Sequence, residues 1–151
     1  MKKNKIIFLI LSGFFFLKAK GQNWDSLGSG LNGYPRILYA DTVDSNLYAA
    51  GFFFTSAGGI PAKGIARWNG TAWDSMATNG FINNPDIYAI TRYNGEIYSE
   101  GRFFSFGVPR HIVKWNGAAW DSVASTDGWV NNFMIYNNEL YVCGGFTTIG
   151  G

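Results

Sequence analysis

Apolar and polar positions along the chain form short runs separated by turn dipeptides, the pattern typical of β-hairpins. The runs "IYAITRY" (87–93) and "EIYSEGRF" (96–103) flank Asn94-Gly95, which suits a two-residue type I′ turn. Asp44-Ser45 and Asn137-Asn138 occupy the same place in two other hairpins, and "HIVKW" and "AAWDSVA" flank a further Asn-Gly at 116–117. No window carries the apolar stripe of a helix, so the chain is predicted to be all-β.

Three short motifs repeat along the chain at intervals of about 40–50 residues. Such a period, with four short strands in each copy, is typical of a propeller blade. The pattern predicts a partial β-propeller of four-stranded antiparallel blades: a lone fourth strand (23–27), two full blades (about 36–77 and 86–124) and half a blade (about 131–147). The motifs are Trp-Asp-Ser at Trp24, Trp73 and Trp120; Trp-Asn-Gly at Trp68 and Trp115; and Tyr-x-x-Gly at Tyr48–Gly51, Tyr98–Gly101 and Tyr141–Gly144.

The repeated tryptophans are predicted to share one face of their hairpin. With a two-residue turn after Trp68, Ala66 would pair with Trp73, and the two indoles would be diagonal neighbours. Arg67 and Asp74 would form a diagonal ion pair on the other face. An indole can bury ~150–250 Å², whereas an exposed ion pair contributes ~0–1 kcal/mol, so the indoles are expected to fill the space between blades. The second copy repeats the arrangement with Trp115, Trp120, Lys114 and Asp121.

Tyr-x-x-Gly at the end of a second strand, then a loop, then "IVKWNGAAWDSV" resembles a kelch-type propeller repeat of the galactose-oxidase superfamily. More specifically, "GFTTIGG" is similar to repeats of secreted Gram-negative bacterial propellers, which also appear in fungal cell-polarity surface proteins. The resemblance covers 22–151 and implies the propeller fold. It does not carry over the copper ligands of that superfamily, because no matching Tyr/His set occurs. At the end of the second strand, only the third copy has a double glycine, Gly144-Gly145, where the other copies have Gly51-Phe52 and Gly101-Arg102.

The number of blades leads to an expectation about length. Propellers typically close with 4–8 blades, and residues 22–151 supply fewer than three at about 47 residues each. We therefore expect 22–151 to be the N-terminal part of a longer propeller whose remaining blades follow Gly151. In a closed ring, the strand around Trp24 could complete the last blade. Self-assembly of partial rings is the alternative.

The first twenty-one residues have the pattern of a signal peptide. Three lysines precede the apolar run "IIFLILSGFFFL" (6–17), and Ala19 and Gly21 place small side chains before the expected cleavage at Gln22. The run is shorter than the ~20 residues of a transmembrane helix, although an uncleaved anchor is the alternative. We expect a secreted or cell-surface protein with no stable membrane span after cleavage.

Removal of this leader changes the charge of the chain. It holds five of the twelve Lys and Arg and none of the ten Asp and Glu, so the mature chain has a net charge of −3. A nucleic-acid partner is therefore not expected. Cys143 is the single cysteine, which excludes an intramolecular disulfide.

No catalytic, metal-binding or cofactor-binding residues are predicted. His111, the only histidine, has no partner recognisable in the sequence, and Cys143 is expected to be a small buried side chain. One His and one Cys cannot supply a zinc or copper site. The Asp and Glu residues are scattered and form neither a calcium loop nor a carboxylate pair.

Aromatic side chains after the second strand of each blade are the candidate ligand contacts: Phe52, Phe53, Phe103 and Phe104. Packing of these rings between blades is the competing interpretation. Three functions remain open: a non-catalytic surface propeller that binds a protein or glycan, a secreted enzyme whose catalytic residues lie outside this sequence, and a structural spacer. The first is preferred, and it rests on fold analogy.

Overall fold

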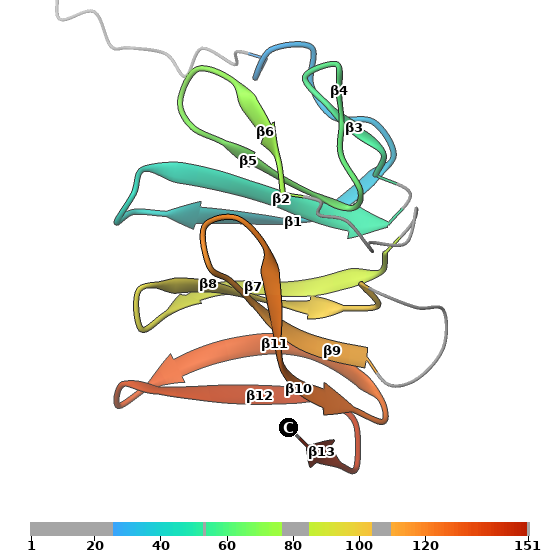
Figure 1. Ribbon diagram of the computed structural model, residues 1–151, viewed down its shortest axis with the longest axis vertical. Helices are drawn as coiled ribbons and strands as arrows, with labels where there is room; N and C mark the ends of the chain where they lie inside the picture. Colours follow the sequence, from blue (N-terminus) through green and yellow to red (C-terminus); the bar gives the residue numbers. More distant parts are fainter. Residues whose placement is uncertain (1–25, 53, 77–84, 104–109, 151) are drawn as a thin grey trace, which may run out of the picture.

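A computed structural model describes residues 26–52, 54–76, 85–103 and 110–150, and these residues form thirteen β-strands (Figure 1). Within those ranges no helix occurs, and so none that is long and apolar enough to span a membrane. The all-β prediction is confirmed. The predicted signal peptide, Trp24, Phe53 and Phe104 lie outside the described residues.

Two meandering antiparallel sheets and a separate hairpin contain the longer strands. The first sheet has the order β1 (Tyr34–Asp41), β2 (Asn46–Phe52), β5 (Ile65–Trp68) and β6 (Trp73–Ser75). The second sheet has the order β7 (Ile87–Tyr93), β8 (Glu96–Gly101), β9 (Arg110–Trp115), β10 (Trp120–Thr126) and β13 (Ile149–Gly150). The third hairpin consists of β11 (Trp129–Tyr136) and β12 (Glu139–Gly145), and a two-stranded ribbon consists of β3 (Ser56–Ala57) and β4 (Ile60–Pro61).

The first sheet, the second sheet and the third hairpin lie in layers one above the other (Figure 1). The first strand of the second sheet, β7, contacts both β1 and β11, so the leading strands of successive layers are neighbours. We call the packed space between the two sheets the first seam, and the space between the second sheet and the third hairpin the second seam. Each seam contains a buried apolar cluster.

All strands predicted for the two sheets and the third hairpin are present, in the predicted order. Two short elements were not predicted: the β3–β4 ribbon, and β13, which pairs with the end of β10. The lone strand expected at 23–27 falls mostly outside the described residues. Its described end, Ser26 and Leu27, is not in a strand. Leu31 forms an isolated bridge with Ala57 and so attaches this segment to the ribbon.

Of the five predicted two-residue turns, those at Asn94-Gly95 and Asn137-Asn138 are confirmed. Tyr93 pairs with Glu96 and Tyr136 with Glu139, and both central residues of each turn have a positive φ, as a type I′ turn requires. The turn at Asp44-Ser45 was predicted wrongly, because Asp41 pairs with Asn46 and leaves a four-residue loop. The Asp41 carboxylate accepts a hydrogen bond from the Val43 N–H at 3.1 Å, which holds this wider loop.

The register predicted for the paired tryptophans was wrong by two residues. Trp68 lies directly opposite Trp73, and Ala66 lies opposite Ser75, so the loop has four residues rather than two. Asn69 explains the longer loop: its side-chain Oδ1 accepts hydrogen bonds from the backbone N–H groups of Thr71 and Ala72. An Asn side chain that bonds the backbone two and three residues ahead replaces the tight turn. Asn116 does the same in the second sheet.

The two indoles still share one face, as predicted, with ring centroids 5.6 Å apart for Trp68 and Trp73. On the other face, Arg67 and Asp74 form an ion pair at 2.9 Å, directly across the strands. The corresponding pair in the second sheet was predicted wrongly. Lys114 forms its ion pair with Glu96 of β8 at 3.1 Å, because β8 offers a carboxylate on the other side of β9.

The paired indoles contribute to the packing between layers. Trp120 is 5 % exposed and belongs to the cluster of the first seam, and its Nε1 donates a hydrogen bond to the Met76 carbonyl of the preceding unit at 2.8 Å. Trp73 repeats this contact with the N-terminal segment, donating to the Leu27 carbonyl at 3.0 Å. Each acceptor lies three residues after a Trp of the Trp-Asp-Ser motif, so the two bonds are equivalent by position.

Candidate functional site

The glycine of each Tyr-x-x-Gly motif lies where two strands come too close for a side chain. A Cβ on Gly51, Gly101 or Gly144 would lie 2.1, 2.3 or 1.9 Å from a carbonyl oxygen of the neighbouring strand. In all three units the glycine pairs with a residue of the first strand at which the register shifts. These glycines therefore permit a bulge that recurs once per unit.

The tyrosine of the same motif faces the following layer. Tyr48 is 2 % exposed in the first seam, Tyr98 is partly buried in the second seam, and Tyr141 is 44 % exposed on the outer face of the third hairpin. Burial raises the pKa of the Tyr48 hydroxyl. The three positions thus differ in exposure according to whether a further layer covers them.

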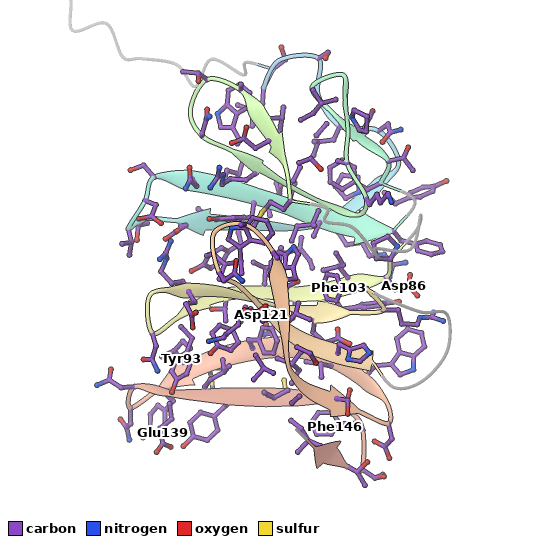
Figure 2. All side chains as sticks on the ribbon, in the orientation of Figure 1. Asp86, Tyr93, Phe103, Asp121, Glu139 and Phe146 are labelled. Carbon is purple, nitrogen blue, oxygen red and sulfur yellow. The ribbon has the colours of Figure 1, made fainter. Side chains whose placement is uncertain are left out.

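The aromatic ligand candidates do not behave alike. Phe103 is fully buried and stacks on Trp120 with ring centroids 5.8 Å apart, so packing between layers, rather than ligand contact, describes this residue. The Phe103 ring belongs to the apolar cluster that fills the first seam. Figure 2 shows Phe103, with Asp86 and Phe146, at one end of the strands, whereas Tyr93 and Glu139 lie at the opposite end. Phe52 is partly exposed and lines a pocket of about 470 Å³ with Tyr34 and Arg36.

A second pocket, which we call the seam pocket, opens into the first seam at the end of the strands where the two-residue turns lie. Its volume is about 320 Å³. Tyr48 and Arg67 of the first sheet line one side, and Ile97 and Trp115 of the second sheet line the other. The remaining lining residues lie in the turns or at the strand ends beside them: Asp44, Arg92, Gly95, Glu96, Asn116 and Gly117. None of these residues was predicted to contact a ligand, because they come from separate turns and strands that only the packing brings together. Tyr48 and Trp115 were identified only as structural residues of the repeat.

Arg92 holds the two sheets together at the rim of this pocket. Its Nε and Nη2 donate to the buried carboxylate of Asp41 at 2.5–3.0 Å, Nη2 also contacts Asp44, and Nη1 donates to the Gly95 carbonyl at 2.6 Å. Burial by itself would raise the pKa of Asp41, but the hydrogen bonds and charge of Arg92 and the Val43 N–H outweigh it, so this pKa is lowered. The hydrogen bonds that Arg92 donates to Asp41, the charge of Asp41 and the charge of Asp44 raise the pKa of Arg92.

Arg67 has unused hydrogen-bonding capacity. Its Nη2 donates to Asp74, and its Nε is buried with no acceptor among the described residues. Leaving a buried donor unpaired costs about 1–3 kcal/mol. The Arg67 side chain remains 35 % exposed at the pocket. On the rim, Glu96 is 35 % exposed and Asp44 is 51 % exposed, so both retain carboxylate oxygens that a ligand can reach.

The two residues considered for catalysis, His111 and Cys143, lie on different strands of the structure. His111 lies near the start of β9, and its Nδ1 is 3.5 Å from the Ser122 hydroxyl, which is long for a hydrogen bond. Cys143 was expected to be buried, but it is exposed, because its side chain lies on the outer face of the third hairpin opposite Asn132. Among the described residues, no three His, Cys, Asp or Glu side chains lie close enough to hold a metal ion.

One repeated contact was missed in the sequence. The Asn32 side chain accepts hydrogen bonds from the backbone N–H groups of Thr55 and Ser56, and Asp127 accepts equivalent bonds from Thr147 and Thr148. The Thr147 hydroxyl and these N–H groups lower the pKa of Asp127. These contacts fasten the loop after the second strand to the end of the preceding unit. In the sequence, the dipeptides Asn-Gly at 32 and 79 and Asp-Gly at 127 could have indicated a repeated contact of this kind.

Comparisons of this chain with protein-family models, with curated proteins and with solved structures gave no match.

Proposed function

We propose that residues 22–151 form part of a β-propeller, in which the first sheet, the second sheet and the third hairpin are successive blades. The observation that supports this most directly is the recurrence of one junction. Trp73 and Trp120 each donate from the indole N–H to the carbonyl three residues beyond the previous Trp-Asp-Ser tryptophan. A blade that is fastened to its predecessor in the same way each time is the packing that a ring of repeated sheets needs.

Exposed apolar side chains at the two ends of the stack favour the presence of further blades. Leu38, Ile90 and Phe133 occupy equivalent positions that face the preceding layer, yet Leu38 is 66 % exposed while Ile90 and Phe133 are 8 % and 7 % exposed. At the other end, Tyr141 is exposed with Met134 on the outer face of the third hairpin. Sheets of the same kind would cover both faces, in keeping with 22–151 as the N-terminal part of a longer propeller.

We assign to this propeller the function of a non-catalytic protein that is secreted or displayed on the cell surface and binds a protein or a glycan. The export leader supports the location. Two pockets at opposite ends of the strands, one around Phe52 and one in the first seam, support a role in binding. The mixed charge of the seam pocket, with arginine and carboxylate side chains together, favours ligands that are neutral and polar.

The decisive test begins with the gene downstream of the Gly151 codon, followed by expression of the complete protein. Further Trp-Asn-Gly-x-x-Trp copies, together with capture of a specific protein or glycan by the purified product, would support the proposal. A carboxylate pair or metal-ligand cluster in those later repeats, with hydrolytic or redox activity, would favour an enzyme instead. Failure to retain any ligand in a glycan array and a surface-protein pull-down would favour a structural spacer.

A further inference from the structure

We infer that the seam pocket is a binding site for one neutral saccharide unit, with Arg67 as its principal hydrogen-bond donor and Trp115 as its apolar wall. This inference rests on the proposed binding function and assigns it a location and a ligand class. All ten lining residues are described, and their volume of about 320 Å³ falls at the lower end of the range for small-molecule pockets.

The two walls of the pocket offer different chemistry. Tyr48 and Arg67 lie side by side on neighbouring strands of the first sheet, and Ile97 and Trp115 lie side by side on the second sheet. Trp115 is only partly buried, so its ring can still accept an apolar partner. A pyranose ring presents C–H groups on its faces and hydroxyl groups around its edge, and it can use both walls at once.

The Arg67 guanidinium retains hydrogen-bond donors that no protein group among the described residues uses. Its guanidinium has one protein acceptor, Asp74, and its buried Nε has none within the described chain. The Arg67 side chain as a whole is 35 % exposed and lines the pocket, so a hydroxyl oxygen that enters can accept a hydrogen bond from the guanidinium. Arg92 is less suited to this role, because Asp41, Asp44 and the Gly95 carbonyl accept from all three of its nitrogen atoms and leave one Nη1 N–H.

The charge of the pocket selects against ions. Arg67 and Arg92 are balanced within the lining by Asp44 and Glu96, so neither an anion nor a cation finds a field of a single sign. A carboxylate or phosphate attracted by Arg67 would also meet the rim carboxylates. A neutral ligand with vicinal hydroxyls can donate to Asp44 and Glu96 and accept from Arg67, which makes use of all three side chains.

The test uses the full 151-residue chain and ligand-observed NMR with the methyl glycosides of glucose, galactose, mannose and N-acetylglucosamine. We expect saturation transfer from the protein to at least one of these sugars. Arg67→Gln should weaken its binding about tenfold to a hundredfold, the range for loss of a hydrogen bond to a charged donor. Asp74→Asn is the matched control: it breaks the same ion pair, but Asp74 does not line the pocket, so binding should change less than threefold.

Asp44→Ala, at the half-exposed rim, gives an independent reading if Arg67→Gln is unstable, and it should also weaken binding several-fold. Equal effects of Arg67→Gln and Asp74→Asn, or stronger binding of inorganic phosphate than of any glycoside, would overturn the inference. So would the absence of saturation transfer from all four sugars. Sugar binding that neither Arg67→Gln nor Asp44→Ala affects would reject this pocket while leaving the proposed glycan-binding function in place.

Discussion

Gly101→Ala tests whether the Tyr-x-x-Gly glycines are required by the close approach of two strands. Gly101 ends β8 opposite Ile87, next to the register shift in β7. The new Cβ would lie 2.3 Å from the Asp86 carbonyl oxygen, so the strands would have to move apart by roughly 1 Å to restore an ordinary contact. No positive φ is involved at Gly101, which leaves steric conflict as the only cause.

The expected change in the free energy of unfolding combines two losses and one smaller gain. Forcing an additional carbon into a packed site typically costs about 1–3 kcal/mol. Separation of the strands also weakens the hydrogen bond from the Arg102 N–H to the Asp86 carbonyl, worth about 1 kcal/mol. Replacing glycine stabilises the folded protein by about 0.4–1 kcal/mol through the unfolded chain. The net result is a free energy of unfolding lowered by about 2 kcal/mol.

Urea denaturation followed by tryptophan fluorescence measures this change, with the slope compared between variants to confirm a common transition. Gly145→Ala is the control, because a Cβ there has no atom within 4 Å and no positive φ. Its stability should equal or slightly exceed that of the parent chain. If Gly101→Ala unfolds within about 0.5 kcal/mol of the parent, a range usual for harmless surface changes, the proposed close approach is incorrect.

Three further predictions concern the contacts between layers. Asp41→Asn should lower the free energy of unfolding by about 3 kcal/mol at neutral pH, because it breaks the buried pair with Arg92. The pKa of Asp41 is lowered in the folded protein, so this stabilisation is present above pH ~4 and is lost as the pH falls through the folded pKa. The free energies of unfolding of the two proteins, measured at decreasing pH, should therefore converge. Asp127→Asn should melt near the parent temperature, since Asn32 makes the equivalent bonds, whereas Asp127→Ala should melt lower. Trp120→Phe should lower the free energy of unfolding by about 2 kcal/mol, because the buried Met76 carbonyl loses its donor, and chemical denaturation would detect it.

Local patterns in the sequence predicted the strands and the turns at Asn94-Gly95 and Asn137-Asn138, because those features depend on neighbouring residues. Asn94-Gly95 requires only its own two φ angles to be positive, and the structure has both. The Trp-Asn-Gly turns were less predictable because the same dipeptide supports two loops of different length. The Asn69 side chain accepts backbone hydrogen bonds from Thr71 and Ala72, which favours the longer loop and shifts the register.

Contacts between layers could not be derived from the sequence, since they join residues that are far apart along the chain. The Asp41–Arg92 pair spans 51 residues, and nothing in either local sequence indicates the other partner. Lys114 had two carboxylates within reach in the sheet, and strand alternation alone did not show that it would contact Glu96. The seam pocket combines turns from both sheets, so it depends on how the sheets are packed.

Hydrogen exchange of the indole N–H groups tests most directly whether these tryptophans fasten successive layers. In the ¹⁵N-labelled protein, Trp→Phe variants assign the signals of Trp73 and Trp120. The structure predicts that both indole protons exchange far more slowly than those of the unfolded chain, because each donates to a carbonyl of the preceding unit. Exchange of both protons at the unfolded rate under native conditions would contradict the account.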